Sequence, residues 1–596
     1  MPNSAANRRI DVTDFGADPT GIRDSAPAII AALAAARAHD GPVTVEFPTG
    51  RYDIWPEAAE RRELYVSNTV GDDPRYRMKT IGILIDGIDD LRLDGNGSSL
   101  IFHGVQTTLA VIDSHRVTVS GLTVDFAVPT VIDATVTDAG VRHGRAFRVL
   151  SVPACTPYRI DGSHVVWHGE TSPQGAEYWS GTDGLDYTQV HDPREQRTYR
   201  VDHNPLFDAV ASIDDLGGGR LSIDYLTDEV PTDAGLVYQM RRTTRDHPGM
   251  LVLESSDVTL SRSTVHFLHG FGLVAQLSRD VTIDHVTFQT PADSGRSSAG
   301  FADFLQFSAV AGDVVIRSCT FDGPHDDPVN IHGTYLRVIG SPDARSLEVE
   351  YRHAETAGFP QFFAGDEVAI IDADSLSPVG EPLTVAAVSG PSGRDGRRPL
   401  RRMTVEFTEP LALTLRSSQS ALRSLVVENL TLAPRVTITD NVFRNVPTRG
   451  VLVTSRRRVL IEGNTFDRVT MPSIYVSGDA QEWYESGAVR NLTISRNEFI
   501  DPAIPAILVA PTQPVLDPAR PVHRGIVVRH NRFRGVRGTI VDARSVAGLR
   551  FHDNDVAPAA VGRAIPSPAI RLRGSTDAVV DTERIPGEFT AAIESD

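Results

Sequence analysis

Hydrophobic and polar residues alternate in short segments that recur from residue 258 to residue 556. Each segment sets aliphatic residues at alternate positions and most end in Phe. The copies lie at 258–267, 281–288, 314–321, 436–443, 459–466, 492–499 and 526–533, with a degenerate copy at 549–556. Alternation of this kind is typical of a strand, and a repeat of about 21 to 34 residues is typical of a stacked coil. We therefore predict an all-β chain folded as a right-handed parallel β-helix, in which each copy contributes one rung.

Two columns of identical residues run through these copies. Asparagines hold one equivalent position, where stacked side-chain amides can hydrogen-bond along the coil and tolerate a left-handed turn. They are Asn441, Asn464, Asn497, Asn531 and Asn554. Cys319 holds the same position in its own copy, so we expect a buried thiol without chemistry. The phenylalanines predict an internal aromatic stack and not a sugar platform.

Two stretches, 131–250 and 335–430, break the repeat and alternate polar and apolar residues between Gly, Pro and Asp turns. We interpret both as inserted β-domains. The segment from Ser25 to His39 predicts a short helix that covers the open N-terminal end of the coil. The expected division is 1–130, 131–250, 251–334, 335–430 and 431–596, with the first, third and last parts belonging to the β-helix.

The charge balance narrows the class of partner. The chain carries 77 acidic and 58 basic residues, a formal net charge of −19, which disfavours nucleic acid and anionic membranes but suits a neutral carbohydrate. Its two cysteines, Cys155 and Cys319, provide neither a disulfide framework nor a zinc spacing. We expect no cofactor and no metal. The N-terminal residues lack the apolar stretch of a secretory signal, so the expected location is cytoplasmic, with secretion as the alternative if the chain has been trimmed.

Polar side chains are densest in GFADFLQFSAV at 300–310 and GPHDDPVNIHG at 323–333, about one rung apart. Aligning the aliphatic residues of the two segments as inward-facing sets the polar residues between them on the outer face. This alignment places Gln306 over Asn330 and Ser308 over His332.

The same alignment stacks Asp303 over Asp327 and leaves Asp326 directed separately. Neighbouring carboxylates repel one another, so a purely structural role would cost stability unless cations or hydrogen bonds compensate. The trio therefore predicts a functional site. Two alternatives stay open: aspartates that only end strands as turn residues, and a bound Ca²⁺ or Mg²⁺, for which no regular ligand spacing is found.

The next rung, VPTRGVLVTS at 446–455, brings Arg449 over Asp327, where a cation would keep a base ionised. A later loop offers Glu482, Trp483, Tyr484 and Glu485 at the same edge, and aromatic faces beside carboxylates suit a sugar. The candidate substrate-binding residues are His325, Asn330, His332, Arg449, Glu482 and Trp483.

Several longer motifs resemble a known family. The segment 11–29, DVTDFGADPTGIRDSAPAI, is similar to the opening of the pectinase-type β-helix superfamily. The motifs FPTGRYDIWPE at 47–57, YVSN at 65–68, GPHDDPVNIHGTY at 323–335 and GDAQEWYESG at 478–487 resemble glycoside hydrolase family 110, the α-1,3-galactosidases.

The resemblance implies an exo-acting enzyme that removes terminal α-1,3-linked galactose with inversion, on a β-helix that carries two β-barrel-like inserts. It implies that Asp326 is the general acid and that Asp327 and Asp303 are the bases. Inversion needs one protonated carboxyl at the leaving oxygen and one carboxylate that holds a water on the opposite face.

Two other functions stay open. An endo-acting polygalacturonase-like hydrolase would need basic residues that read uronate carboxylates, and His332, Arg449 and the run 456–458 are the candidates. A non-catalytic carbohydrate-binding β-helix would use the acidic groove only to read hydroxyls. The sequence leaves undecided whether branched blood-group B type or linear galactosides are preferred, what the inserts do, and the oligomeric state.

Overall fold

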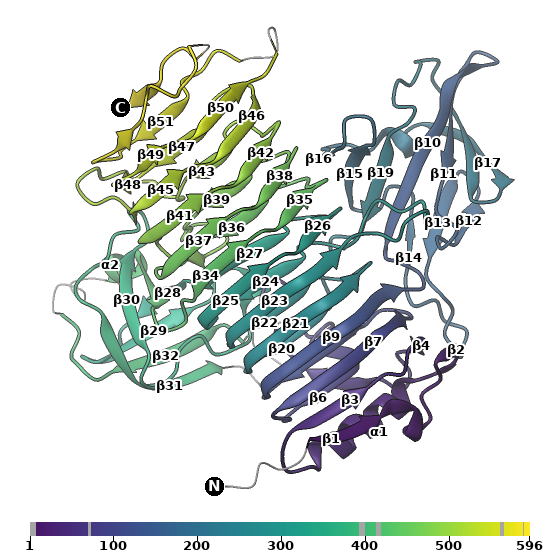
Figure 1. The fold of residues 1–596 in the computed structure, drawn as a ribbon, viewed down its shortest axis with the longest axis horizontal. Helices are drawn as coiled ribbons and strands as arrows, with labels where there is room; N and C mark the ends of the chain where they lie inside the picture. The colour runs from purple at the N-terminus through teal and green to yellow at the C-terminus, as the bar shows by residue number, and fades with distance from the viewer. Residues whose placement is uncertain are drawn as a thin grey trace.

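The computed structural model describes residues 7–69, 73–392, 400–412, 419–560, 565–587 and 589–595. Most of them form a coil of stacked parallel strands, which supplies one 21-stranded sheet and one 14-stranded sheet (Figure 1). Successive sequence repeats pair in parallel and in register, as Val281 does with Val314 and Val436 with Val459. The predicted coil of parallel β rungs is confirmed.

The larger sheet contains β1 (Arg8–Asp11), β2 (Thr20–Asp24), β3 (Val43–Glu46), β4 (Arg51–Ile54), β7 (Leu91–Phe102), β9 (His115–Phe126), β21 (Ser256–Val265), β23 (Arg279–Phe288), β25 (Ala311–Arg317), β34 (Arg435–Thr439), β37 (Arg458–Glu462), β41 (Asn491–Ser495), β45 (Ile526–Arg529), β49 (Arg550–His552) and β52 (Val579–Val580). The short strands that complete its repeats are β26 (Thr320–Asp322), β35 (Val442–Arg444), β38 (Thr465–Asp467), β42 (Glu498–Ile500), β46 (Arg532–Val536) and β50 (Asp555–Pro558).

The second sheet contains β5 (Glu60–Glu63), β6 (Met78–Asp86), β8 (Thr107–Ile112), β20 (Met250–Leu253), β22 (Leu273–Gln276), β24 (Leu305–Ser308), β27 (Val329–Thr334), β36 (Val451–Val453), β39 (Ile474–Val476), β40 (Glu485–Ser486), β43 (Ile507–Val509), β47 (Val541–Arg544), β51 (Ile570–Arg573) and β53 (Ile593–Ser595). Strands β24, β27 and β36 are consecutive neighbours, and this part of the sheet carries the aspartates.

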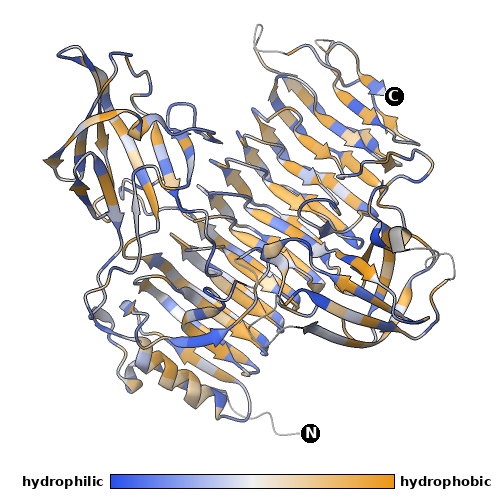
Figure 2. Ribbon diagram, turned by 180° about the vertical axis from the view of Figure 1, so that it is seen from behind, coloured by the Kyte–Doolittle hydropathy of each residue, from blue (hydrophilic) through white to orange (hydrophobic). Residues whose placement is uncertain are grey.

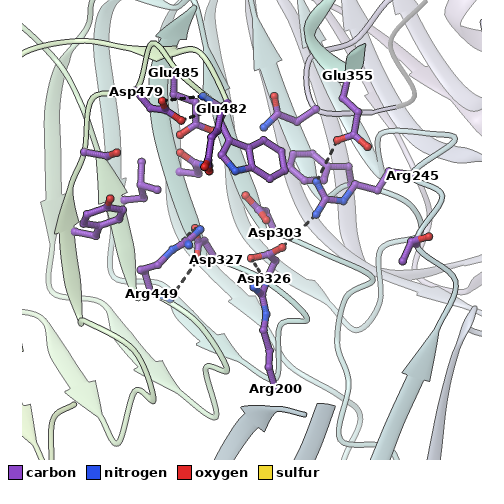
Figure 3. A pocket seen from close by; sticks show the side chains of 18 of the residues that line it. Arg200, Arg245, Asp303, Asp326, Asp327, Glu355, Arg449, Asp479, Glu482 and Glu485 are labelled. Atoms are coloured by element: carbon purple, nitrogen blue, oxygen red, sulfur yellow. Dashed lines mark hydrogen bonds and ion pairs between the residues drawn. The ribbon is translucent and has the colours of Figure 1, made fainter. Parts of the chain in front are cut away.

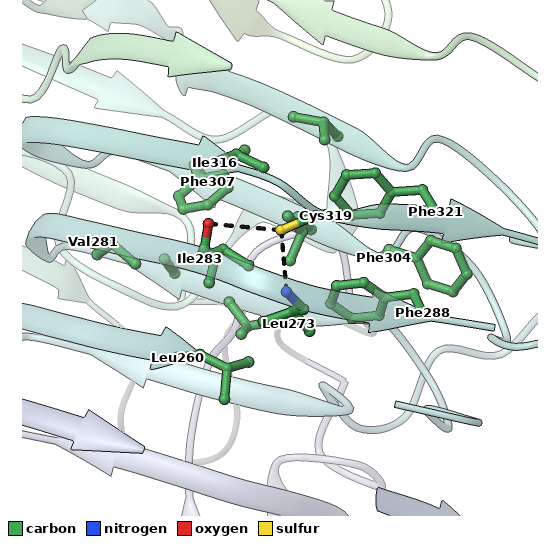
Figure 4. Packing of buried hydrophobic residues seen from close by; sticks show 14 of the residues in the cluster. Leu260, Leu273, Val281, Ile283, Phe288, Phe304, Phe307, Ile316, Cys319 and Phe321 are labelled. Carbon is green, nitrogen blue, oxygen red and sulfur yellow. Dashed lines mark hydrogen bonds between the residues drawn. The ribbon is translucent and has the colours of Figure 1, made fainter. Parts of the chain in front are cut away.

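Buried aliphatic and aromatic residues fill the interior of the coil, and Figure 2 shows them along its strands. Phe288, Phe321 and Phe443 stack with ring centroids 5.4 and 5.0 Å apart, and the stack continues through Phe466 and Phe499. Figure 4 shows Cys319 among these residues. Its buried thiol contacts the backbone N–H of Val286 at 3.5 Å, which agrees with the structural role predicted for it.

The asparagine column forms a continuous hydrogen-bonded ladder. Asn464 donates from its side chain to Oδ1 of Asn497 at 2.9 Å, and Asn497 donates to Oδ1 of Asn531 at 3.0 Å. The backbone N–H groups of Asn464 and Asn497 bind the same acceptors. The residue before each asparagine adopts the left-handed conformation, for example Arg496 with φ 55°. The asparagines therefore lie next to the bend between the two strands of each repeat and do not form it.

The first insert is an open antiparallel sheet, not a barrel. Its seven-stranded sheet contains β10 (Val131–Arg142), β11 (Arg145–Ser151), β15 (Tyr187–Asp192), β16 (Arg197–Arg200), β17 (Val210–Gly217), β18 (Arg220–Tyr225) and β19 (Val237–Arg241). A separate three-stranded sheet contains β12 (Tyr158–Asp161), β13 (His164–His168) and β14 (Ser180–Thr182). The expectation of two barrel-like inserts is therefore wrong for this one, because the order β16-β15-β19-β10-β11-β18-β17 leaves β16 and β17 as unpaired edges.

The second insert is a closed six-stranded barrel. It contains β28 (Leu336–Gly340), β29 (Ser346–Glu350), β30 (Glu367–Asp372), β31 (Leu383–Ser392), β32 (Arg402–Phe407) and β33 (Leu425–Asn429). Leu336, Val349, Val405 and Val427 belong to its own buried cluster, separate from that of the coil. The short helix α2 (Gln419–Arg423) precedes β33.

The predicted N-terminal helix is present as α1 (Ala26–Arg37), with Ser25 at its N-cap and Pro27 in its first turn. Ile29 and Leu33 are buried against the end of the coil, so the helix covers that end (Figure 1). No helix in the described part of the chain is long and apolar enough to cross a membrane.

Candidate active site

A pocket of about 530 Å³ opens beside β24, β27 and β36, and both inserts contribute to its wall. The residues that line it are Asn68, Tyr187, Arg200, Arg241, Thr243, Arg245, Phe271, Asp303, Asp326, Asp327, Asn330, Glu355, Arg449, Leu452, Tyr475, Ser477, Asp479, Glu482, Trp483, Glu485 and Thr512. All three predicted aspartates lie in it, as Figure 3 shows.

Strand pairing brings the aspartates together across 24 residues of sequence. Leu305 pairs with Val329, and the N–H of Phe304 donates to the carbonyl of Asp327 at 3.2 Å. This register sets Asp303 over Asp327, as the alignment of the two segments predicts. Asp303 is 4% exposed and Asp327 is 1% exposed, so neither carboxyl is solvated as on a free surface.

The four polar residues predicted for the outer face pair as expected, Gln306 with Asn330 and Ser308 with His332, but all four are buried. The strand β40 pairs with the end of β27. Only Asn330 of the four lines the pocket. This outer face of the sheet is therefore covered by other parts of the protein and is not open to solvent.

Two of the predicted binding residues stand behind the pocket wall. His325 is fully buried, and its Nε2 lies 3.2 Å from the hydroxyl of Ser298. His332 is 3% exposed, and its Nδ1 lies 2.7 Å from the carbonyl of Gly333. Neither lines the pocket, and their role in binding the sugar stays a prediction.

Arg449 binds Asp327, as the rung alignment predicts. Its Nε lies 3.0 Å from Oδ2 of Asp327, its Nη2 lies 2.5 Å from the same oxygen, and its backbone N–H donates to Oδ1 at 3.1 Å. Both carboxylate oxygens are therefore occupied by Arg449. The fit follows from parallel pairing, because Val329 and Val451 are register partners two residues further along each strand.

Asp326 is held by two arginines that the sequence did not single out. Nη2 of Arg200 lies 2.8 Å from Oδ1, and Nη2 of Arg245 lies 3.2 Å from Oδ2. Arg200 ends β16, the edge strand of the first insert, and Arg245 lies on the return from that insert to the coil. Arg245 also approaches Glu355 of the second insert at 3.8 Å.

These contacts give the three carboxyls different proton affinities. Burial raises the pKa of Asp303 well above its ordinary value, and the negative charges of Asp326 and Asp327 add to this. Burial also raises the pKa of Asp327, although Arg449 opposes it. Burial acts in the same direction on Asp326, but Arg200 and Arg245 outweigh it and the pKa of Asp326 is lowered. The unliganded trio therefore favours a proton on Asp303 and a charge on Asp326.

The loop from Asp479 to Glu485 forms the opposite wall. Asp479 shapes it by accepting the backbone N–H groups of Gln481, Glu482 and Trp483 at 2.7 to 3.0 Å. Trp483 is 44% exposed and stacks on His353 of the second insert, with ring centroids 4.5 Å apart. Glu482, Trp483 and Glu485 line the pocket, as expected.

Tyr484 points away from the pocket. It belongs to the buried cluster at the base of the second insert, and its hydroxyl receives a hydrogen bond from Arg337 at 3.0 Å. The backbone is left-handed at this residue, with φ 59°, which turns the side chain away from its neighbours in the loop.

One group among the described residues has the composition of a metal site, namely Asp246, His247 and His269, whose ligand atoms lie within 4.8 Å of one another. The backbone N–H of Thr80 donates to Nε2 of His247 at 3.2 Å, so in the neutral ring the proton resides on Nδ1. That proton faces Asp246 and leaves no lone pair for an ion. The contacts of this group are with other protein residues, for example His269 Nε2 with Asp246 at 2.7 Å.

Comparison with known proteins adds the family. The protein of Streptomyces avermitilis named alpha-1,3-galactosidase A is 52% identical over 549 residues, which cover 92% of this chain and 87% of that protein. The chain belongs to the alpha-1,3-galactosidase family. The alpha-1,3-galactosidase A of Peterkaempfera griseoplana is 45% identical over 593 residues, covering 98% and 81% of the two chains. The protein of the same name from Bacteroides fragilis is 34% identical, covering 97% and 92%.

A comparison with protein-family models found no match to this chain. Solved structures resemble it less closely. An exopolygalacturonase from Thermotoga maritima gives a TM-score of 0.39 at 11% identity, covering 97% of this chain and 90% of that one.

Several residues of the site went unnoticed in the sequence. Asn68 and Asp479 stand inside the motifs at 65–68 and 478–487, so those motifs contained the signal to find them. Arg200, Arg241 and Arg245 carry no such signal, because they lie in or directly after an insert with irregular strand patterns.

Proposed function

We propose that this chain is an exo-acting, inverting glycoside hydrolase that removes terminal α-1,3-linked galactose from oligosaccharides or glycans. The main support for this proposal is that three aspartates lie together in the pocket of a chain that is 52% identical to a protein named alpha-1,3-galactosidase A. A pocket of about 530 Å³ suits one or two sugar units better than the middle of a polymer, which supports exo action.

The roles that the family resemblance implies are Asp326 as general acid and Asp303 with Asp327 as the carboxylates that hold the attacking water. The way in which protons are distributed among the three aspartates must be compatible with these roles. Asp326 must gain a proton before it can protonate the leaving oxygen, whereas the unliganded site favours that proton on Asp303. We propose that sugar binding weakens the contacts of Asp326 with Arg200 or Arg245 and moves the proton from Asp303 to Asp326.

Two observations argue against a polygalacturonase-like activity. Arg200, Arg245 and Arg449 already bind carboxylates of the protein and are not free to read uronates. From the run 456–458, Arg456 binds Glu428 of the second insert. Neither observation favours a second candidate function.

The experiment that tests the proposal is incubation with linear and branched terminal α-1,3-galactosides while proton NMR follows the released sugar. We expect β-galactose to appear first, from one or both substrates. A comparison of its release from the two substrates shows which is preferred. Initial appearance of α-galactose would refute inversion, and absence of free galactose from both would refute the hydrolase. Polygalacturonate serves as the comparison substrate and is expected to remain intact.

A further inference from the structure

Arg241 is a buried arginine of the pocket wall with an unusually fixed backbone. It is the last residue of β19 and pairs with Val131 of β10 on one side and with Tyr187 of β15 on the other. Its side chain lines the pocket although the residue is only 3% exposed. The strand therefore holds Arg241 at the pocket wall with little of the residue exposed.

Arg241 has no acidic partner among the described residues, in contrast to Arg200, Arg245 and Arg449, which bind the aspartates. Nη1 donates to the carbonyl of Arg242 at 2.9 Å, and Nε is buried without a hydrogen-bond partner. A buried cation without a counter-charge is costly. Burial and the nearby Arg245 lower the pKa of Arg241 to about 10, so the group stays charged at neutral pH.

Two aromatic rings hold the guanidinium in place. Its central carbon lies 4.3 Å from the ring centroid of Tyr187 in the first insert and 4.9 Å from that of Phe301 in the coil. Both distances are typical of cation–π contacts, which restrain the planar group. Of the two terminal nitrogens of the guanidinium fork, Nη1 binds the Arg242 carbonyl, and Nη2 has no hydrogen-bond partner among the described residues.

We propose that Arg241 is a specificity-determining residue that donates hydrogen bonds to hydroxyl groups of the terminal sugar. The inference rests on the proposed function and names the residue that reads the galactose ring. A neutral sugar fits better than an anion, because Asp326, Asp327 and Glu485 line the same pocket and would repel a second negative charge. Nη2 carries two N–H donors and can therefore bind one or two hydroxyl oxygens.

The test measures binding rather than turnover. Isothermal titration with galactose and with its 2-, 3-, 4- and 6-deoxy derivatives is carried out on the wild-type protein, on Arg241→Met and on the control Arg242→Met. A hydrogen bond to a charged group corresponds to about 10- to 150-fold in affinity. Arg241→Met is expected to weaken galactose binding by that factor, and Arg242→Met, at an exposed position outside the pocket, by less than about 2-fold.

The decisive result comes from a double-mutant cycle, in which one change is made in the protein and the other in the sugar. At least one deoxy sugar is expected to bind the wild type about 10-fold or more weaker than galactose, yet to bind Arg241→Met as well as galactose does. The inference is overturned if Arg241→Met keeps the wild-type pattern across the deoxy series, or if the wild type shows no affinity for galactose. Stronger binding of galactose 6-sulfate than of galactose to the wild type overturns it in favour of an anionic sugar.

Arg241→Lys provides a second variant if Arg241→Met does not fold, because it keeps the charge and loses the fork; the same cycle is expected with it. Turnover of an α-1,3-galactoside is recorded in parallel. Binding that depends on Arg241 without turnover would refute the hydrolase proposal alone. Normal turnover with an unchanged deoxy pattern in the variant would refute the role of Arg241 alone.

Discussion

Arg200 of the first insert binds Oδ1 of Asp326 in the coil at 2.8 Å, across 126 residues of sequence. The contact makes the first insert part of the candidate active-site pocket. Because the charge of Arg200 lowers the pKa of Asp326, the insert also favours the charged form of that carboxyl in the unliganded site.

Replacing Arg200 by Met is expected to shift the pH profile of kcat toward higher pH on its alkaline side. Without this cation the pKa of Asp326 rises, so the carboxyl keeps its proton to a higher pH and can act as the acid there. The measurement is kcat against pH for a disaccharide substrate. Arg194→Met, at an exposed loop position of the same insert, is the control. A shift of the acidic side instead would mean that Asp326 acts as a base.

Asp326→Asn is expected to slow hydrolysis of an α-1,3-galactosyl disaccharide by about 10²- to 10⁴-fold, the usual contribution of a general acid. α-Galactosyl fluoride needs no proton on its leaving group, so the variant is expected to hydrolyse it almost as fast as the wild type does. Asp303→Asn and Asp327→Asn are expected to slow both substrates, because they hold the water. If Asp303→Asn alone spared the fluoride, the proton would be donated by Asp303 and the assignment of roles would be wrong.

The coil could be predicted in detail because its information is local and repeated. Each copy carries its own alternation, and the register between copies follows from keeping aliphatic residues inside, which is how Asp327 was placed next to both Asp303 and Arg449. The ladder from Asn441 to Asn554 needed only equivalent positions.

The rest of the site depends on tertiary packing that no repeat encodes. The outer face that bears His332 and Ser308 is buried, which the alternation of residues along the strands does not indicate. Arg200 and Arg245 reach Asp326 only because an insert packs back on the coil, and the sequence contains no pattern that states where an insert packs. The closure of the second insert and the open edges of the first likewise follow from pairings between strands distant in sequence.

Arg449→Met is expected to destabilise the fold in a pH-dependent manner. Asp327 is 1% exposed and would lose both side-chain hydrogen bonds to its Oδ2, whereas the backbone N–H of residue 449 would still donate to Oδ1. Loss of one partner of a buried ion pair costs about 3–5 kcal/mol. Burial raises the folded-state pKa of Asp327 above the unfolded value, and more so without Arg449, so the native state binds the extra proton and stability falls as pH rises above about 4.

The measurement is urea unfolding of Arg449→Met between pH 4 and 8. Arg444→Met, which removes a more exposed arginine paired with Asp322, is the control and is expected to cost about 1 kcal/mol or less at every pH. A pH-independent loss in Arg449→Met would show that packing rather than the charge of Asp327 is responsible.

Asn497→Ala is expected to lower the free energy of unfolding by about 2–4 kcal/mol, because it removes the acceptor of two N–H donors of Asn464 inside the coil. Asn491→Ala, at the exposed start of β41, is the matched control and is expected to change stability by about 0.5 kcal/mol or less. Equal losses in the two variants, measured by denaturant unfolding, would contradict the ladder as a source of stability.

Trp483→Ala is expected to raise KM roughly 5- to 20-fold with a smaller change in kcat. The indole is 44% exposed at the pocket rim and is held by His353 beneath it, so its free face is available to stack on the sugar beyond the cleaved bond. Phe363→Ala, at a similarly exposed aromatic residue of the second insert outside the pocket, is the control and is expected to leave both constants unchanged. His353→Ala tests whether the stacking contact positions the indole. If it does, this variant is expected to raise KM by less than Trp483→Ala does. An unchanged KM in both Trp483→Ala and His353→Ala would mean that the tryptophan only covers the histidine.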